Sequence, residues 1–505
     1  MIEIPQANHR AGRREWIGLA VIALPCALYS MDLTVLNLAV PSLSAALRPS
    51  GAELLWIVDI YGFLVAGTLI TMGTLGDRIG RRKLLLIGAA AFGLASALAA
   101  FSTTSAMLIA TRALMGVAAA TLAPSTLSLI RNMFHDPGER TVAISIWIMS
   151  YSAGAAIGPI VGGLLLEHYW WGSVFLINVP IMLLLLAIGP VLLPEYRDTK
   201  AGRLDIASAA QSLAAVLSVI YGLKRVAEGG SAGLAILSIA AGLALGVLFL
   251  RRQARLADPL IDIRLFRIPA FSAALAVNMF GFLTAFATFL FIAQYLQSVL
   301  GLTPMQAGLW GLPSALAFIA ASMVTPAIVR RYAAAQVIAG GMLVSAAGFV
   351  ILSQTGGASS PLAVLVAGQI VFSVGLTPVA VLTTDIILGA APPERAGSAS
   401  ALSETSAEFG GALGIALMGS IVTALYRGGI AGPSADAIPG EALETARGTI
   451  GAAVNAAAEL PGESGSALLE MARLAFTDAF GAAAWISAFI AITVALLAIR
   501  MLRNP

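Results

Sequence analysis

The segment Gly73-Thr-Leu-Gly76-Asp77-Arg78-Ile-Gly80-Arg81-Arg-Lys83 joins two long apolar runs and carries the most specific pattern in the chain. Gly76 and Gly80 permit a sharp turn and a close approach of helices, because they lack a side chain. A basic loop that only sets membrane topology would not need glycine, aspartate and arginine at this spacing. The pattern therefore indicates a tight turn with a role beyond topology, and the topological role alone is the alternative.

Asp77 and Arg81 are the charged groups of this turn with the clearest chemistry. The Asp77 carboxylate can accept hydrogen bonds from the free amide groups at a helix N-terminus. The Arg81 guanidinium is expected to reach an acid on the next charged loop, where Asp136 and Glu139 are available. Such contacts would tie the turn to other helices.

Composition places the flanking runs in a membrane protein. Of the 505 residues, 59% are hydrophobic and only 11% are charged, whereas soluble domains carry about 25% charged residues. The charges cluster and leave uncharged stretches of about 18 residues or more, which cross roughly 30 Å of hydrocarbon as helices. We expect an all-α integral membrane protein. Its fourteen spans are predicted near residues 16–40, 53–75, 84–103, 107–130, 141–166, 171–193, 205–223, 234–250, 270–296, 305–329, 335–355, 361–388, 397–426 and 476–499.

Fourteen spans place both termini on one side of the membrane, and the basic residues indicate which side. If the N-terminus is cytoplasmic, the cytoplasmic segments hold most of the 29 Lys and Arg residues. Cytoplasmic loops carry such an excess of positive charge, so the sequence predicts cytoplasmic N- and C-termini. The first apolar run is longer than the core of a secretory signal and is read as the first span.

Charged connectors divide the spans into groups of six, two and six. The first group occupies residues 1–194, the inserted pair with its connectors 195–267, and the last group 268–505. Transporters are commonly built from repeated bundles, so we expect two similar six-helix bundles plus two extra helices. Segment 428–475 would lie on the extracytoplasmic side of the membrane and is predicted to form one or two short amphipathic helices broken near Pro461. It is either a solvated linker or a lid over the outer mouth.

Further motifs resemble those of the major facilitator superfamily. The turn described above resembles the family's signature between spans two and three. Leu108-Ile-Ala-Thr-Arg112-Ala-Leu-Met-Gly116 resembles its fourth-span arginine motif. Gly154-Ala-Ala-Ile-Gly158-Pro159-Ile-Val-Gly162-Gly163 resembles the fifth-span motif of its drug/proton exporters. Met31-Asp32-Leu-Thr34-Val-Leu-Asn37-Leu-Ala39-Val-Pro41 is similar to the first-span motif of the fourteen-span exporters.

The resemblance covers nearly the whole chain and points to the fourteen-span drug:proton antiporters of QacA/SmvA type. It implies the major facilitator fold and export of quaternary ammonium compounds, viologens and cationic dyes. It also implies a gating role for the turn residues Gly73, Gly76, Asp77, Arg78, Gly80 and Arg81. The second copy of this signature is reduced to Arg330-Arg331-Tyr332. Because it lacks the aspartate and the paired glycines, no gating role is expected there.

The fifth-span motif has a physical interpretation of its own. Gly154, Gly158 and Gly162 recur every four residues and form one ridge of small residues, along which a neighbouring helix can approach closely. Pro159 removes a backbone donor and favours a kink. With Gly163, the motif is predicted to form a hinge or a seal at the interface of the two bundles. Ordinary helix packing is the alternative.

Glu404 and Glu408 lie near the middle of span thirteen. Their i, i+4 spacing puts both carboxylates on one helix face. A charge at mid-bilayer costs roughly 2.5–3.5 kcal/mol on insertion scales, and two carboxylates so close do not readily ionise together. We therefore expect the pair to exchange a proton for a lipophilic cation, which assigns it to both proton coupling and substrate binding.

Asp32 and Arg112 are the other proton-coupling candidates. Residue counting puts Asp32 in the outer half of span one and Arg112 in the inner or middle part of span four. A guanidinium does not lose its proton, so Arg112 needs a partner. The family resemblance implies pairing or proton relay with span one. Since Asp32 counts as further out than Arg112, the direct pair is a hypothesis that a charge swap tests.

Two more acids lie near the ends of spans. Asp59, with Trp56 and Tyr61, is near the outer end of span two and is predicted to form an entrance that attracts cations, because aromatic faces bind quaternary ammonium. An interfacial aromatic belt with one solvated acid is the alternative. Asp385 is near the inner end of span twelve and is read as a side chain that reaches the cytoplasm.

These features together predict a proton-coupled antiporter of the bacterial inner membrane that exports lipophilic cationic drugs, dyes and biocides, including biguanide-like ones. The alternative is an exporter of a physiological metabolite or peptide. No enzymatic activity is expected, and a lipid-modifying enzyme is disfavoured because no nucleophile, metal site or acid–base pair is apparent. The single cysteine, Cys26, excludes a disulfide framework. The expected partners are cations, protons and lipid but not nucleic acid; the proton-motive force takes the place of a cofactor, and we expect a monomer.

Overall fold

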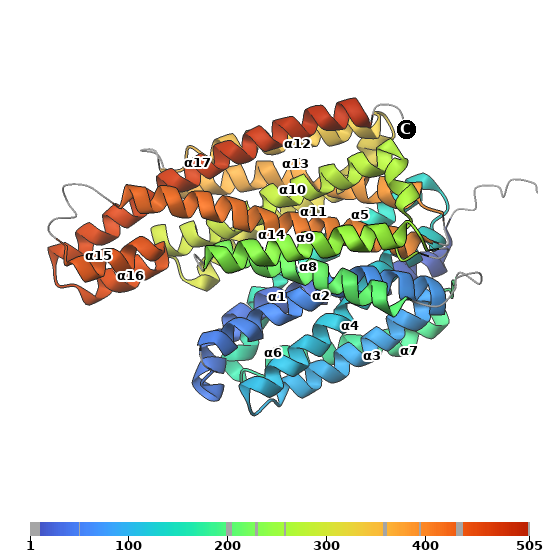
Figure 1. The fold of residues 1–505 in the computed structure, drawn as a ribbon, viewed down its shortest axis with the longest axis horizontal. Helices are drawn as coiled ribbons and strands as arrows, with labels where there is room; N and C mark the ends of the chain where they lie inside the picture. The colour runs from blue at the N-terminus through green and yellow to red at the C-terminus, as the bar shows by residue number, and fades with distance from the viewer. Residues whose placement is uncertain are drawn as a thin grey trace, which may run out of the picture.

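The computed structural model describes residues 11–49, 51–197, 205–227, 231–256, 259–356, 361–392, 395–430 and 438–502. In these residues, fourteen helices are long and apolar enough to cross a membrane. The predicted all-α, fourteen-span class is thereby confirmed. Figure 1 shows these helices running roughly side by side along the long axis of the molecule.

The first group of helices forms one bundle, drawn in blue to teal in Figure 1. Its helices are α1 (Arg13–Leu47), α2 (Gly51–Ile79), α3 (Arg81–Ala100), α4 (Ser105–Met133), α5 (Pro137–His168), α6 (Ser173–Leu176) and α7 (Asn178–Leu192). The expected sixth span is thus broken at Ile177 into α6 and α7. Within the bundle α1 packs mainly on α5, and α4 packs on α2 and α3.

The inserted helices α8 (Ile206–Ala227) and α9 (Ala232–Gln253) pack on each other, and α8 also packs against α2 and α14 (Ala396–Gly429). A charged contact joins the ends of the pair. Asp205 accepts hydrogen bonds from Arg252 at 2.8 Å and from the Ser208 hydroxyl at 2.8 Å. These two donors lower the pKa of Asp205 to about 2, so the carboxylate stays ionised at neutral pH.

The last group forms the second bundle. Its helices are α10 (Pro269–Gln294), continued by η2 (Tyr295–Val299), then α11 (Pro304–Val329), α12 (Ala334–Leu352), α13 (Pro361–Ala390), α14 and α17 (Glu463–Met501), with the short η1 (Ile263–Arg267) ahead of them. In this bundle α12 packs on α13 and α17, and α10 packs on α14. The two groups correspond to the expected bundles, and the domain boundaries drawn from the sequence stay a prediction.

The segment between α14 and α17 contains two short helices, α15 (Gly440–Gly448) and α16 (Ile450–Glu459). They contact α14, α17 and η2, and the Tyr426 hydroxyl donates to the carbonyl of Ala446 at 3.0 Å. Two helices ending before Pro461 agree with the prediction, but a solvated linker does not, because Ala446, Ile450 and Ala453 are buried. The last span begins at Glu463, earlier than expected, because its first turns continue the helix and pack against α16. The role as a lid stays a prediction.

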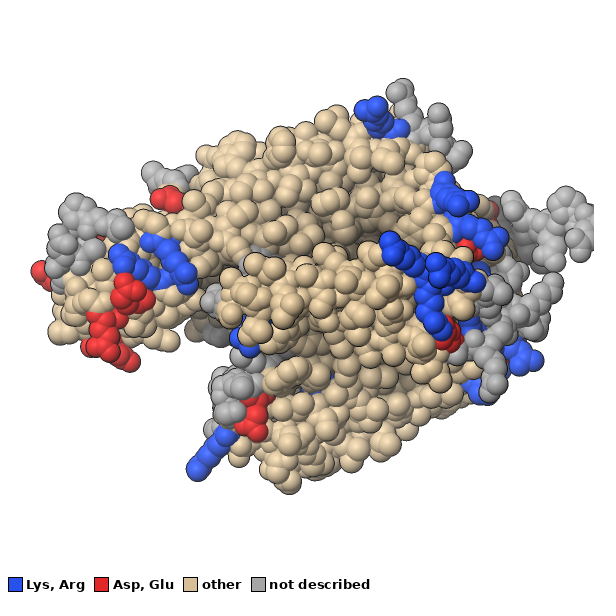
Figure 2. Space-filling view, in the orientation of Figure 1, with Lys and Arg blue, Asp and Glu red and all other residues tan. Residues whose placement is uncertain are grey.

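The two bundles meet along two pairs of surfaces. Helices α2 and α4 contact α14, and α5 contacts α11 and α13. Figure 2 shows Lys and Arg side chains gathered at one end of the molecule and a notch between the two halves at the opposite end, beside α15 and α16. The expected cytoplasmic face corresponds to the basic end. The orientation itself stays a prediction.

Candidate functional site

Glu404 and Glu408 lie on α14, on the surface that faces the first bundle. Both side chains are half-buried. The hydroxyl of Tyr29, on α1, donates a hydrogen bond to Glu408 Oε1 at 3.2 Å and so joins the two bundles. Glu404 has no hydrogen-bonding or ion-pair partner among the described residues, although it interacts electrostatically with Glu408. The two acids therefore differ: Glu408 is tethered and Glu404 is free to take a ligand.

Aromatic rings of the first bundle form a wall opposite these acids. The Tyr29 ring lies 5.9 Å from that of Tyr61 and 5.7 Å from that of Tyr151. Tyr151 in turn contacts Trp147 at 4.8 Å. These rings come from α1, α2 and α5, so they meet only when the helices are packed. A cation between this wall and Glu404 would meet aromatic faces and a carboxylate together.

A buried ion pair lies behind the aromatic wall. Arg112 Nη1 is 2.7 Å from Asp32 Oδ2, and the side chains are 0% and 3% exposed. Arg112 Nε also donates to the carbonyl of Ile57 at 3.1 Å. The guanidinium lies 4.7 Å from the centre of the Tyr61 ring, and Asn178 donates weakly to Asp32 Oδ1 at 3.4 Å. The structure thus confirms that Asp32 and Arg112 form a direct ion pair, and their role in proton coupling stays a prediction.

The depth assigned to Arg112 from the sequence was wrong. Helix α4 begins at Ser105, at the end opposite the basic one, and ends at Met133. Arg112 is therefore close to the start of its helix and lies at the level of Asp32. The error came from counting depth as if span four ran outward, whereas it runs toward the basic end.

Trp56 and Tyr61 do not form one surface. Trp56 is 46% exposed and packs against Phe63, whereas Tyr61 is fully buried against Arg112. They are five positions apart on a helix, so they point in different directions. The side chain of Asp59 lies outside the described side chains. Tyr61 therefore lies at the inner wall near Tyr29, and Trp56 alone lies at the outer surface.

The loop motif connects the two bundles at the basic end. Asp77 accepts hydrogen bonds from the backbone amides of Gly397 and Ser398, both at 3.1 Å, at the start of α14. The expected contact with a helix N-terminus is confirmed. Arg81 Nη2 lies 2.6 Å from Asp77 Oδ1.

The expectation that Arg81 reaches an acid of the next loop was wrong. Asp136 accepts from the amide of Glu139 and so caps α5, and Glu139 accepts from the amide of Ala11. Arg81 is nearest to Asp77 because the two residues are one helical turn apart across the bend.

The glycines of the motif account for its shape. A Cβ on Gly73 would lie 2.5 Å from the carbonyl oxygen of Gly397, so α2 and α14 touch backbone to backbone here. Gly80 has φ of +111°, a conformation that side chains disfavour. A larger residue at Gly73 would separate the bundles, and one at Gly80 would strain the turn into α3. Arg78 lies in the same turn and is half-buried.

A second contact joins the bundles at the basic end. Arg140 Nε on α5 lies 2.7 Å from Asp385 Oδ1 on α13, and the Thr141 hydroxyl donates to Asp385 Oδ2 at 2.9 Å. The side chains of Arg140 and Asp385 are 13% and 16% exposed. Asp385 was read from the sequence as a side chain reaching the cytoplasm. It instead turns toward the other bundle, because a basic partner lies there.

The glycine ridge of the fifth-span motif packs within the first bundle. A Cβ on Gly154 would collide with the carbonyl oxygen of Ala27, and one on Gly162 would lie 2.8 Å from Val35. The ridge thus allows α5 and α1 to approach closely. Gly163 faces Met305 at the start of α11 in the other bundle. The side chain of Pro159 lies outside the described side chains, and the hinge or seal stays a prediction.

Comparison with known proteins identifies the family. Residues 22–415 match the Major Facilitator Superfamily. The multidrug efflux pump LfrA of Mycolicibacterium smegmatis is 40% identical over 98% of this chain and 97% of its own length. The chain belongs to the Major Facilitator Superfamily.

Other relatives in the superfamily are resistance proteins. The methyl viologen resistance protein SmvA of Salmonella typhimurium is 37% identical over 92% of this chain and 93% of its own. The tetracenomycin C resistance and export protein of Streptomyces glaucescens is 31% identical over 96% of this chain and 91% of its own. The resemblance to fourteen-span drug exporters, stated from the motifs, is thereby confirmed.

Solved structures of the superfamily share the fold. The human organic anion transporter MFSD10 aligns with a TM-score of 0.60 and 15% identity, over 94% of this chain and 99% of its own. A bacterial homologue of the human lysosomal transporter Spinster, in an inward-facing conformation, aligns with a TM-score of 0.60 and 18% identity, over 98% of both chains. At this identity the likeness concerns the fold alone.

Several residues of this superfamily member's site were missed by sequence reasoning. Tyr29, Trp147 and Tyr151 are single aromatic residues in apolar helices, and no local pattern marks them. No local pattern marks Arg140 either, since it is one basic residue in a charged loop. Its pairing with Asp385 joins residues 245 positions apart. Among the described residues, no group of three or more His, Cys, Asp or Glu side chains is placed to hold a metal ion.

Proposed function

We propose that this protein is a proton-coupled exporter of lipophilic cations in the bacterial inner membrane, acting as a monomer and not as an enzyme. The observation that carries the proposal is the pair Glu404 and Glu408 facing the aromatic wall of the other bundle, with Tyr29 bonded to Glu408. The site combines the two features that attract an organic cation, which are negative charge and aromatic faces.

The chemistry of exchange follows from the unpaired carboxylate of Glu404. A half-buried carboxylate without a partner inside a membrane span is costly, so it takes up either a proton or a cation. Glu404 lacks a partner among the described residues and is the first binding group in this proposal. A cation arriving at Glu404 replaces its proton, and a proton arriving from outside replaces the cation. The two ligands exclude each other, and this exclusion couples their movements.

The Asp32–Arg112 pair is the second half of the proposed coupling. Tyr61 lies between the two sites: its ring contacts both Arg112 and Tyr29. A change of charge at Glu408 acts on Tyr29, and through Tyr61 on the ion pair. In this proposal Asp32 and Arg112 sense the occupancy of the acids without binding the cargo.

Alternating access requires the basic end to open. The contacts of Asp77 with α14 and of Asp385 with Arg140 hold that end closed in this structure. Both join different bundles, so rocking one bundle against the other breaks them together. We propose that the motif between α2 and α3, through Asp77, acts as the gate at this end.

The names of the relatives support the substrate class. A multidrug efflux pump and a methyl viologen resistance protein are both more than a third identical over nearly the whole chain. Methyl viologen is an organic dication, which suits two acids near aromatic rings. A relative described as a tetracenomycin C resistance and export protein, at 31% identity, keeps export of a metabolite as the second candidate.

The test is transport into proteoliposomes. Vesicles with an acid interior and an alkaline exterior should accumulate methyl viologen, because protons leave as the cation enters. The variant Glu404→Gln/Glu408→Gln should reduce accumulation to the level of protein-free vesicles. The exposed pair Glu441→Gln/Glu470→Gln makes the same chemical change on the outer surface and should transport normally.

If the Glu404→Gln/Glu408→Gln variant shows undiminished gradient-driven accumulation, these two acids are not the coupling site. If the unaltered protein accumulates methyl viologen equally with and without a pH gradient, transport is not coupled to protons. Competition with a neutral drug and with a dipeptide separates the candidates: only cations should compete if the acids bind the cargo. Size-exclusion chromatography of each variant verifies that it is folded.

A further inference from the structure

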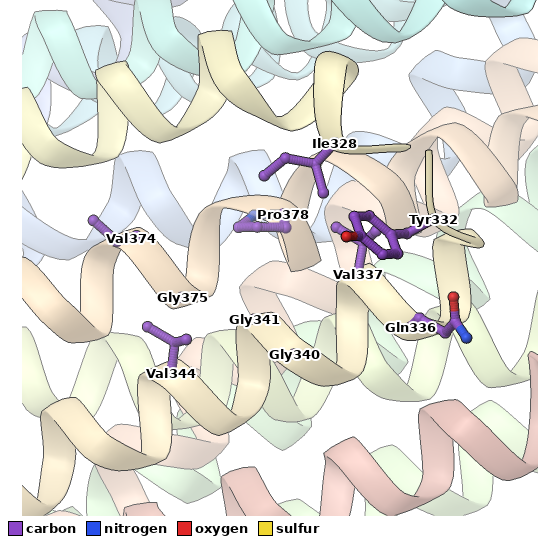
Figure 3. A pocket seen from close by; sticks show the side chains of 10 residues that line it. All are labelled: Ile328, Tyr332, Gln336, Val337, Gly340, Gly341, Val344, Val374, Gly375 and Pro378. Atoms are coloured by element: carbon purple, nitrogen blue, oxygen red, sulfur yellow. The ribbon is translucent and has the colours of Figure 1, made fainter. Parts of the chain in front are cut away.

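A groove in the second bundle lies away from the proposed transport site. It has a volume of about 440 Å³ and runs between α11, α12 and α13. Figure 3 shows Ile328 and Tyr332 on one of its sides and Gln336 and Val344 on another, with Pro378 of α13 between them. The lining residues are Ile328, Tyr332, Gln336, Val337, Gly340, Gly341, Val344, Val374, Gly375 and Pro378.

The groove exists because α12 packs tightly on one neighbour and hardly on the other. A Cβ on Gly341 would lie 2.5 Å from the carbonyl oxygen of Gly375, so α12 and α13 touch backbone to backbone. Helix α12 makes few contacts with α11, from which a short turn separates it. Helix α11 packs on α13 instead, so the space between α11 and α12 stays open above α13. Gly340 faces this space, since nothing lies within 4 Å of a Cβ built there.

The shape and lining of the groove suit a hydrocarbon chain. Gln336, Gly340 and Val344 lie on α12 at successive turns and span about 12 Å of helix. Apart from Tyr332 and Gln336 at one end, its lining side chains are apolar. Because α12 packs mainly on α13 and α17, its remaining face lies at the periphery. The groove therefore opens toward the surrounding lipid.

Positive charge lies at one end of this groove. Arg330 and Arg331 follow directly after α11 and are exposed, and Tyr332, which is 60% exposed, belongs to the groove itself. Neither arginine makes an ion pair with a described residue. This is the sequence in which the second copy of the gating signature has lost its aspartate and glycines. The second copy therefore keeps two arginines but has no acid equivalent to Asp77, which pairs with Arg81 in the first copy.

We propose that the groove binds an anionic phospholipid of the leaflet at the basic end. One acyl chain lies along Ile328, Gly340 and Val344, and the phosphate lies at Arg330 and Arg331, within reach of Tyr332 and Gln336. Positive charge at the mouth selects an anionic headgroup and repels a cationic drug. The proposal takes the basic end as cytoplasmic. It does not depend on the proposed transport function.

The test uses phosphatidylglycerol that carries a photoreactive diazirine in its acyl chain. Irradiation of the purified full-length protein should label peptides containing residues 328–344 and 374–378, as mapped by mass spectrometry. Unlabelled phosphatidylglycerol should compete better than phosphatidylcholine. Arg330→Gln/Arg331→Gln should weaken labelling about fivefold per arginine, because each basic residue near an anionic lipid surface contributes a corresponding free energy. Gly340→Leu should abolish labelling by filling the groove.

Two variants are matched controls. Arg251→Gln/Arg255→Gln removes two exposed arginines at the end of α9, and Gly246→Leu adds a side chain in open space on the same helix. Both should label as the unaltered protein does. Labelling of the groove that survives both Gly340→Leu and the Arg330/Arg331 change would overturn the proposal. Equal competition by phosphatidylcholine would overturn the headgroup selection, and displacement of the label by methyl viologen would make the groove a cargo site instead.

Discussion

At the scale of single residues, the acids inside the spans are distinguished by their partners. Asp32 is paired with a buried arginine, Asp385 with one near the basic end, and Glu408 with a tyrosine hydroxyl. Glu404 has no such partner among the described residues. Since Glu404 alone of these four lacks a described partner, it is the acid to which the proposed mechanism assigns first binding of the proton or the cation.

The Asp32–Arg112 pair illustrates how a buried charge is tolerated. Arg112 is fully buried, yet its donors reach Asp32 and the carbonyl of Ile57, and its face is covered by Tyr61. Removing one member of such a pair leaves an uncompensated charge, which costs about 3–5 kcal/mol. The geometry is therefore required for stability as well as for any relay.

Charge reversal measures how much the Asp32–Arg112 pair contributes to the stability of the protein. Asp32→Arg and Arg112→Asp should each lower the free energy of unfolding by about 3–5 kcal/mol. The double variant should recover part of the loss, because the charges attract again although the carbonyl of Ile57 then faces a carboxylate. Thermal unfolding in detergent measures the three variants. Glu444→Gln, which breaks an exposed pair with Arg447, should change little. A double variant no more stable than the worse single one would contradict direct pairing.

At the scale of helices, closure of the basic end rests on two crossings. Helix α2 meets α14 through Gly73 and Asp77, and α5 meets α13 through Arg140 and Asp385. Each crossing joins the two bundles, the first through close backbone packing beside the buried Asp77 and the second through a largely buried ion pair. Weakening either one should shift the population of states toward opening at that end.

Asp385→Asn should open the basic end more often. Hydrogen bonds to charged groups contribute about 1.5–3 kcal/mol, so we expect at least about tenfold faster maleimide labelling of a Ser145→Cys reporter, in a Cys26→Ser background that removes the only native cysteine. Ser145 is buried one turn from Thr141. Asp262→Asn, whose exposed partner Arg264 is 3.5 Å away, is the control and should label normally. An unchanged rate in Asp385→Asn would show that this contact does not hold the end closed.

At the scale of the whole molecule, the proposed site lies where the bundles face each other. One bundle supplies the acids of α14, and the other supplies the aromatic wall and the ion pair behind it. Neither bundle alone contains a complete cation site, so binding depends on how the two are placed. This division explains why a rocking motion can change affinity without rearranging either bundle internally.

Pulsed EPR distances between spin labels test the rocking motion. In the Cys26→Ser background, Lys83→Cys and Tyr332→Cys report on the basic end, and Phe101→Cys and Gly428→Cys report on the opposite end. All four positions are exposed. A change of pH or addition of methyl viologen should lengthen one distance while it shortens the other. Distances that change in the same direction, or not at all, would contradict rigid rocking of the bundles.

Local features of the sequence determined the class of this protein. Apolar runs of sufficient length gave the fourteen spans, because crossing a bilayer is a matter of length and composition. The i, i+4 spacing placed Glu404 and Glu408 on one face, since the geometry of a helix depends only on position along it. The motif around Asp77 and the arginine motif around Arg112 resemble those of the family for the same reason, since each is a short pattern within one or two helices.

The tertiary structure alone decided which charges meet. Tyr29 and Glu408 are 379 positions apart, Arg140 and Asp385 are 245 apart, and Asp32 and Arg112 are 80 apart. Spacing along the chain does not determine such contacts, because they depend on the direction and packing of separate helices. The groove beside Gly340 arises in the same way, from α12 lying against α13 and away from α11. What each helix is follows from its own residues; which site the helices build together follows from how they pack.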